Sequence, residues 1–374
     1  MRNLIDLKHK LPIFKVNKKT FHQGHVWQMF LPHSRKMKKS EIIYQKLIAP
    51  TEDLISDLKK LDGDILILGV GGKMGPALAR LTRQGIEQAG IHKNVIGVAR
   101  FSEPGLEDEL SNVGIETIVA DLLDDDQLAG LPQVENVLYL AGTKFGTSGQ
   151  EAQTWAMNAY LPGRVAQKFK NSRIVAFSTG NVYPFTTVES GGAPENLAPE
   201  PIGEYAQSCL GRERIFQYFA AKNQTPLLIY RLNYANDVAY GVLLEIAKSV
   251  RDQRPIDLKM GSVNVIWQGD ANEFALRSLL HCSLPPKILN VTGPEILSVR
   301  WLAEEFAKKL GIKPIFVNEE LPTSLLSNAT ECTRLFGQPK VSILQMIEVI
   351  LDWLLEGGKI FNKPTHFSER NGKF

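Results

Sequence analysis

The chain contains 374 residues, of which 44% are hydrophobic and 22% are charged, and its formal net charge is +3. A chain of this size can bury a large core and form one large or two modest domains. No apolar run reaches the roughly 18–20 residues of a membrane helix, and the N-terminus lacks the apolar stretch of a secretory signal. We therefore expect a cytoplasmic protein that does not cross a membrane.

The three cysteines, Cys209, Cys282 and Cys332, are too few for a disulfide framework. Their spacing also matches no metal-binding pattern. We expect thiols in a reducing compartment and no metal site.

The first 36 residues are strongly basic, with eight lysines and arginines against one acid. Without them, the chain has 35 basic and 39 acidic residues, so its formal net charge becomes −4. A basic arm that binds nucleic acid is one interpretation. We favour a surface or partly disordered extension, so nucleic acid is an unlikely partner. A third interpretation is that Met37 is the true start and residues 1–36 are an upstream extension of the reading frame.

A glycine-rich turn follows the first apolar run of the chain. Residues 65–68 read Ile-Leu-Ile-Leu, and a helix-like stretch begins at Pro76. The turn between them includes Gly69, Gly71, Gly72, Lys73, Met74 and Gly75. Glycines let the backbone approach a pyrophosphate, and the N-terminus of the following helix attracts anions. The pattern predicts a dinucleotide site at this turn, although a plain strand-turn-helix without a ligand would also fit.

Five further apolar runs follow at regular intervals, separated by helical segments. With the first run they span 65–68, 94–99, 115–121, 134–142, 172–179 and 225–231. Unbroken apolar runs are typical of parallel strands that are buried on both faces. The alternation predicts an α/β fold with a doubly wound parallel sheet, the Rossmann fold, whose ligands bind at the carboxyl ends of the strands.

Several motifs together resemble the extended short-chain dehydrogenase/reductase superfamily, in its NAD-dependent epimerase/dehydratase branch. The glycine turn fits the G-x-x-G-x-x-G fingerprint of that branch, and Phe177-Ser-Thr-Gly-Asn-Val-Tyr183 resembles its catalytic Ser/Thr strand. The resemblance implies that Thr179 and Tyr205 are catalytic. It also implies a set of cofactor contacts beyond the glycine turn, which are Asp121, Leu122, Ala141, Gly142 and Asn158.

The match covers roughly residues 63–355 and implies a smaller substrate-binding lobe at the C-terminal end. We expect residues 1–62 to form the basic extension and a lead-in helix, and residues 63–235 to form the NAD(P)-binding domain. Residues 236–366 would mainly form the substrate-binding lobe, with the segment near 285–293 returning to the sheet.

The chain departs from the family at the catalytic helix, which usually carries Tyr-x-x-x-Lys. Here the stretch is Tyr205-Ala-Gln-Ser-Cys209. Tyrosine titrates near pH ~10, so a neighbouring positive charge is needed for proton transfer at neutral pH. Cysteine supplies none, and the nearest substitute on the same helix face is Arg212, about 10 Å along the axis. Cys209 as a nucleophile is an alternative, but a buried small cysteine is commoner.

The end of the second strand favours NADP over NAD. An acid usually binds the ribose 2′-hydroxyl of NAD at this position, whereas a basic residue accommodates the 2′-phosphate of NADP. Arg100 occupies the position, and Lys73 adds positive charge nearby. NAD binding without the usual acid is the alternative.

These features predict an NAD(P)-dependent oxidoreductase or epimerase that acts on a sugar, sugar acid or nucleotide-sugar. Tyr205 would remove a hydroxyl proton while hydride leaves the same carbon, and Thr179 would donate a hydrogen bond to the reacting oxygen. The alternative is an NAD(P)-binding sensor or scaffold that lost catalysis with the lysine. The expected partner is a small sugar-derived molecule, and the protein could form a homodimer.

Overall fold

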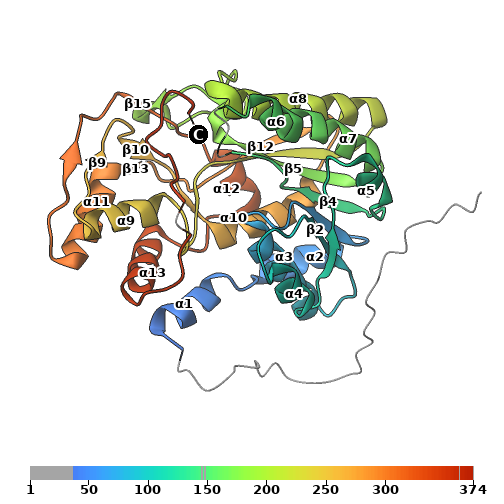
Figure 1. The fold of residues 1–374 in the computed structure, drawn as a ribbon, viewed down its shortest axis with the longest axis horizontal. Helices are drawn as coiled ribbons and strands as arrows, with labels where there is room; N and C mark the ends of the chain where they lie inside the picture. Colours follow the sequence, from blue (N-terminus) through green and yellow to red (C-terminus); the bar gives the residue numbers. More distant parts are fainter. Residues whose placement is uncertain (1–36, 145, 147–148, 362, 374) are drawn as a thin grey trace, which may run out of the picture. The chain divides into compact units, whose positions relative to one another are not determined.

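The computed structural model describes residues 37–144, 146, 149–361 and 363–373. In this part of the chain, seven strands form one sheet in the order β12-β7-β5-β4-β1-β2-β3 (Figure 1). Every neighbouring pair in it is parallel. The strands are β1 (Ile65–Leu68), β2 (Val95–Ala99), β3 (Glu116–Val119), β4 (Asn136–Tyr139), β5 (Arg173–Thr179), β7 (Leu227–Leu232) and β12 (Lys287–Val291). The predicted α/β doubly wound fold is therefore confirmed.

Helices cover both faces of the sheet because alternate side chains of each strand point to opposite faces. On one face, Ile65 and Ile67 pack in a core with α2 (Glu52–Lys60), α3 (Gly75–Ala89) and α10 (Gln268–Arg277). On the other face, Leu66 and Leu68 pack in a second core. That core includes α5 (Asp125–Gly130), α7 (Leu161–Lys168) and α8 (Gly203–Asn223).

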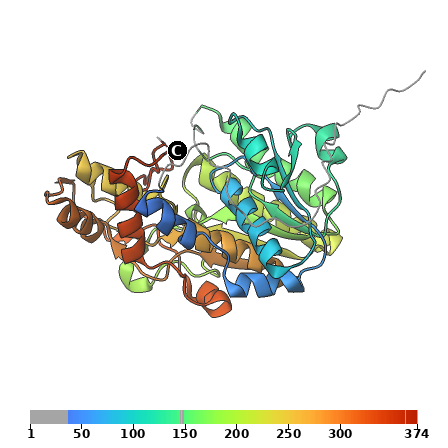
Figure 2. The same cartoon turned by 90° about the horizontal axis from the view of Figure 1, so that it is seen from below.

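A third hydrophobic core lies within the smaller lobe. Figures 1 and 2 show this lobe next to the side of the sheet where the carboxyl ends of the strands lie. Its helices are α1 (Lys39–Leu47), α9 (Val242–Arg251), α11 (Val299–Leu310) and α13 (Ile343–Leu355). The ring of Tyr44 on α1 packs against Trp267 and Trp353, with ring centroids 6.0 and 5.6 Å away. Its hydroxyl donates a hydrogen bond of 3.0 Å to Asp237. Helix α1 thus packs in the core of the smaller lobe, whereas α2 packs against the sheet just before β1.

The remaining elements are short. The helices are α4 (Leu106–Ser111), α6 (Glu151–Trp155), α12 (Thr330–Phe336), the π-helix Ala156–Tyr160 and the 3₁₀ turns Gly180–Val182, Val188–Ser190 and Ser278–His281. The strands are β6 (Thr186–Thr187), β8 (Ala235–Asn236), β9 (Ile256–Asp257), β10 (Ser262–Val263), β11 (Ile266–Trp267), β13 (Leu297–Ser298), β14 (Phe316–Val317) and β15 (Thr323–Ser324).

The segment near 285–293 supplies the edge strand β12, which pairs with β7. None of the helices in the described residues is long and apolar enough to cross a membrane. The basic extension over residues 1–36 lies outside the described residues.

Candidate functional site

The glycine turn connects β1 directly to α3 and has little room for side chains. Gly69 has a φ of +88°, and a Cβ there would lie 2.7 Å from the backbone N of Ala141. A Cβ at Gly75 would lie 2.2 Å from the carbonyl oxygen of Val70. At Gly72 the nearest atom would be the Gly69 oxygen at 3.3 Å. The fold itself thus requires glycine at positions 69 and 75, whereas a side chain at position 72 would make one tight contact with a backbone oxygen.

Two cavities meet at this turn. One, of about 230 Å³, lies beyond β2 and β3, and the other, of about 380 Å³, lies beyond β5 and β7. Gly69, Gly72, Leu140 and Gly142 line both of them. No side chain caps the start of α3, so the N–H groups of its first turn point toward this junction without a competing cap. The arrangement fits a dinucleotide whose pyrophosphate lies on the turn and whose two halves enter the two cavities.

The smaller cavity gathers the residues expected to contact the adenosine half. Its lining includes Gly71, Arg100, Asp121, Leu122 and Ala141. Arg100 is exposed at the end of β2. The carboxylate of Asp121 accepts a hydrogen bond of 3.0 Å from the backbone N–H of Leu123, which fixes its direction.

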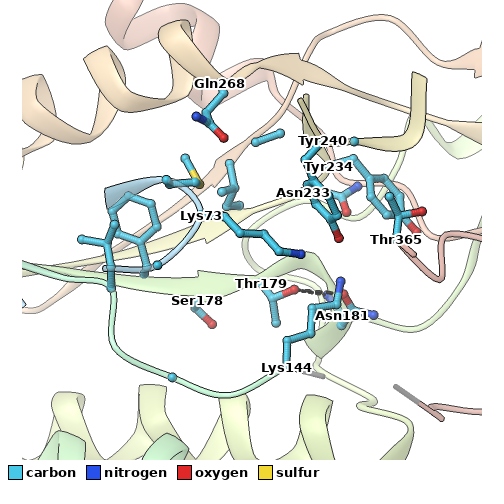
Figure 3. A pocket seen from close by; sticks show the side chains of 18 of the residues that line it. Lys73, Lys144, Ser178, Thr179, Asn181, Asn233, Tyr234, Tyr240, Gln268 and Thr365 are labelled. Atoms are coloured by element: carbon cyan, nitrogen blue, oxygen red, sulfur yellow. Dashed lines mark hydrogen bonds between the residues drawn. The ribbon is translucent and has the colours of Figure 1, made fainter. Parts of the chain in front are cut away.

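The larger cavity brings Thr179 and Tyr205 together, with Lys73, Met74 and Gly75 of the turn also in its lining. Thr179 ends β5, and Tyr205 lies in the first turn of α8. The Thr179 hydroxyl donates a hydrogen bond of 2.9 Å to the side-chain oxygen of Asn181, drawn as a dashed line in Figure 3. It also shares a hydrogen bond with the hydroxyl of Tyr205.

Burial dominates the electrostatics of Tyr205 and raises the pKa of its hydroxyl. The neighbouring Cys209 raises this pKa further, whereas the charge of Arg212 and the hydrogen bond to Thr179 lower it without restoring the ordinary value. Cys209 is fully buried, and burial raises the pKa of its thiol as well. At neutral pH both groups carry their protons, so Cys209 has the properties of a buried packing residue.

Arg212 lies behind the cavity and is absent from its lining. Its guanidinium donates hydrogen bonds of 2.8 Å to the carbonyl oxygen of Phe177 and 2.7 Å to the side-chain oxygen of Asn158. A Cβ on Gly142 would lie 2.3 Å from the same guanidinium. Glycine at 142 therefore makes room for Arg212 as well as lining both cavities.

Asn158 lies in the π-helix Ala156–Tyr160 and lines neither cavity. Its side chain binds both backbone groups of Thr143, accepting from the N–H at 2.9 Å and donating to the carbonyl oxygen at 2.8 Å. It also donates to the hydroxyl of Ser208 on α8 at 3.0 Å. In this arrangement Asn158 ties the loop after β4 to helix α8.

Two lysines enter the larger cavity from different elements, as Figure 3 shows. The ammonium of Lys144, in the loop after β4, lies 5.6 Å from the ring centroid of Tyr205. Burial lowers its pKa to about 8. The ammonium of Lys73 lies 3.4 Å from the ring centroid of Tyr240, and burial, followed by the charges of Lys144 and Lys363, lowers its pKa to about 7.

Sequence reasoning did not single out Lys144 or the lobe residues of this cavity. The lobe residues in the lining include Asn233, Tyr234, Tyr240, Gln268 and Thr365. Lys144 could have been suspected from its place just beyond the end of β4, since parallel strands present their ligands at that end. Asn233 and Tyr234 carried the same signal because they directly follow β7, whereas Tyr240, Gln268 and Thr365 follow no strand of the main sheet.

The fold defined by this sheet, turn and lobe is found in solved structures of nucleotide-sugar epimerases. One is the UDP-glucuronic acid 4-epimerase from Bacillus cereus in complex with NAD, with 18% identity, a TM-score of 0.63 and coverage of 79% of this chain and 100% of that chain. Another is the UDP-glucose 4-epimerase from Thermotoga maritima with UDP-glucose, with 16% identity, a TM-score of 0.62 and coverage of 79% and 99%. No family model and no curated protein sequence matches the chain. At this level of identity the likeness shows the fold.

Proposed function

We propose that this protein is an NAD(P)-dependent oxidoreductase or epimerase that acts by hydride transfer on a sugar, sugar acid or nucleotide-sugar. The observation that carries the proposal is the meeting of Thr179 and Tyr205 in a cavity that opens onto the glycine turn. The solved structures of the same fold include two UDP-sugar epimerases, which favours a nucleotide-sugar as the substrate.

The positions of the two cavities support one arrangement of the two halves of the cofactor. Asp121 and Leu122 would hold the adenine, Gly72 would leave space for the pyrophosphate, and Thr179 would lie beside the nicotinamide end. When bound, the nicotinamide supplies the hydride acceptor and donor. Arg100 stands at the end of β2, where an acid would bind the ribose of NAD, and its charge would accommodate a 2′-phosphate. We therefore propose that NADP is preferred. The Bacillus cereus structure contains NAD.

Tyr205 would act as the acid/base of the reaction. Its hydroxyl would remove a proton from a substrate hydroxyl and return it in the reverse direction, while Thr179 donates a hydrogen bond to the same substrate oxygen. Because burial raises the pKa of Tyr205, little tyrosinate forms at neutral pH and the rate should increase toward alkaline pH.

The test begins with titration of NAD and NADP, followed by turnover assays with UDP-glucose, UDP-glucuronic acid, and free sugars and sugar acids. Tyr205→Phe should lower turnover by at least about a hundredfold and leave cofactor affinity unchanged. Tyr218→Phe is the matched control, because Tyr218 is exposed on the same helix. Full activity of Tyr205→Phe would contradict the assignment and make Cys209 the next residue to test.

A sensor or scaffold remains the alternative function. The observation that favours it is the neutral, buried thiol at position 209, where the family carries lysine. Cofactor binding without hydride exchange on any of these substrates would support the sensor and reject the enzyme.

We also propose a cytoplasmic homodimer. The three cysteines are free thiols, as expected in a reducing compartment.

A largely apolar groove, proposed as the dimer interface, has a volume of about 620 Å³, lies between α5, α7 and α8 and includes the exposed Tyr160. Tyr160→Glu should shift a dimer toward monomer in light scattering, whereas Leu344→Glu on the exposed face of α13 should not. A wild-type protein that is monomeric at all concentrations would contradict this proposal.

A further inference from the structure

Helix α8 provides no cation one turn after Tyr205. Position 209 is a fully buried cysteine packed with Val182 and Tyr183. Burial keeps its thiol protonated, and any charge on it would oppose the formation of tyrosinate. Arg212 is the nearest cation on the helix, but its guanidinium is fixed behind the cavity by hydrogen bonds.

A positive charge reaches Tyr205 from another element. Lys144 lines the same cavity, and its ammonium lies 5.6 Å from the Tyr205 ring centroid. Figure 3 shows its side chain extending from the loop after β4 toward Thr179 and Asn181. The charge of Lys144 also lowers the pKa of the neighbouring Cys209 thiol, against the larger effect of burial.

A continuous set of hydrogen bonds joins the backbone just before Lys144 to helix α8. Thr143, the preceding residue, is bound through both backbone groups by Asn158 at 2.9 and 2.8 Å. Asn158 donates to the hydroxyl of Ser208 at 3.0 Å, and that hydroxyl donates to the carbonyl oxygen of Tyr205 at 2.9 Å. The loop that carries Lys144 is therefore tied directly to the helical turn that carries Tyr205.

We propose that Lys144 is a positioning residue that supplies Tyr205 with the positive charge missing at position 209. This inference rests on the proposed function, in which Tyr205 transfers a proton. The charged and titratable groups that face Tyr205 are Cys209 and Arg212 from α8 and Lys144 from the loop after β4, with Lys73 across the same cavity. Among them, Lys144 and Lys73 are the cations within the cavity lining, and Lys73 is placed against Tyr240.

The test measures the tyrosinate fraction of Tyr205 without relying on turnover. Tetranitromethane nitrates tyrosinate, so the nitration rate of the peptide containing Tyr205, followed by mass spectrometry against pH, reports its ionisation. Lys144→Met should lower this rate at neutral pH by about ten- to a hundredfold and shift the profile toward alkaline pH. Lys144→Arg should keep most of the wild-type rate. The pH profile of turnover should shift in the same direction.

Rescue and control variants separate charge from structure. Adding Cys209→Lys to Lys144→Met should restore the nitration profile, because it returns a cation from the helix side. Arg214→Met removes a positive charge from the exposed face of α8 and should leave the profile unchanged. Equal melting temperatures would exclude misfolding, and if Lys144→Met fails to fold, Lys144→Gln replaces it.

An unchanged nitration profile in a folded Lys144→Met or Lys144→Gln variant would overturn the inference. A shifted profile in a protein that turns over no candidate substrate would support the role of Lys144 and count against the proposed function. The two proposals therefore fail separately.

Discussion

Substitutions at Gly72 and Gly75 should separate cofactor binding from folding. A Cβ at position 75 would lie 2.2 Å from the Val70 carbonyl oxygen, a backbone atom that cannot move without displacing the turn from β1. Overpacking lowers the free energy of unfolding by about 1–3 kcal/mol. Because the obstacle at position 75 is a backbone atom, we expect Gly75→Ala to lose about 3 kcal/mol. An unfolding entropy of about 2.1 cal/mol/K per residue gives about 1.3 °C per kcal/mol for 374 residues, so we expect the melting temperature to fall by roughly 4 °C.

Position 72 behaves differently because its nearest obstacle is the Gly69 oxygen at 3.3 Å and it lines both cavities. Gly72→Val should change the melting temperature by no more than about 2 °C. The tight contact destabilises the folded protein, and the loss of conformational freedom in the unfolded chain stabilises it by a similar amount. A side chain there would exclude phosphate oxygens from the backbone N–H groups. Losing one or two charge-assisted hydrogen bonds costs about 3 kcal/mol, so affinity should fall by about a hundredfold.

Calorimetric titration with NAD and NADP measures the affinities, and thermal denaturation measures the stabilities. Gly130→Val is the control, because a Cβ at Gly130 meets no atom within 4 Å. Wild-type affinity of Gly72→Val for both cofactors would refute the placement of the pyrophosphate. A wild-type melting temperature for Gly75→Ala would refute the close approach of the turn to the start of α3.

Three further predictions concern cofactor choice, pH and the N-terminal extension. Arg100→Ser should weaken NADP binding by about tenfold and spare NAD in parallel titrations, and an equal loss for both would contradict the role of Arg100. Cofactor affinity should be highest at low pH and fall as pH rises through about 7 to 8, where Lys73 and then Lys144 lose their protons. Titrations in which affinity rises over this range would contradict the contribution of these lysines. A variant that begins at Met37 should keep its melting temperature and cofactor affinity, and insolubility would show that residues 1–36 stabilise the fold.

The centre of the sheet could be predicted from the sequence because its strands are buried on both faces. Residues 65–68 are all apolar and all buried, and the neighbouring β2 is likewise apolar and fully buried. Two-residue strands such as β6 and β8 have no such signal, since their pairing depends on how the lobe packs. The π-helix around Asn158 could not be predicted either, because its extra residue serves hydrogen bonds to the loop after β4 and to α8.

Cavity residues at strand ends could also be predicted from the sequence. Parallel topology brings residues such as Thr179 and Asp121 to one edge of the sheet whatever the loops do. Contacts between loops and helices could not be predicted in this way. Arg212 was predicted as the nearest substitute for the missing lysine, and the carbonyl of Phe177 and the side chain of Asn158 hold its guanidinium outside the cavity lining. The sequence showed the spacing along the helix and gave no information on these acceptors.

The same reasoning explains why a missing helix lysine need not remove the charge that a tyrosine requires. Helix periodicity makes Tyr-x-x-x-Lys recognisable in sequence, but the contribution of a cation to the ionisation of the tyrosine depends on its distance from the hydroxyl and on the medium between them. At an effective dielectric constant of about 20, moving a charge from ~4 to ~6 Å reduces its effect only from about 4 to about 3 kcal/mol. A residue in a loop, such as Lys144 with its ammonium 5.6 Å from the Tyr205 ring centroid, can therefore contribute an effect of the same order as a cation on the helix.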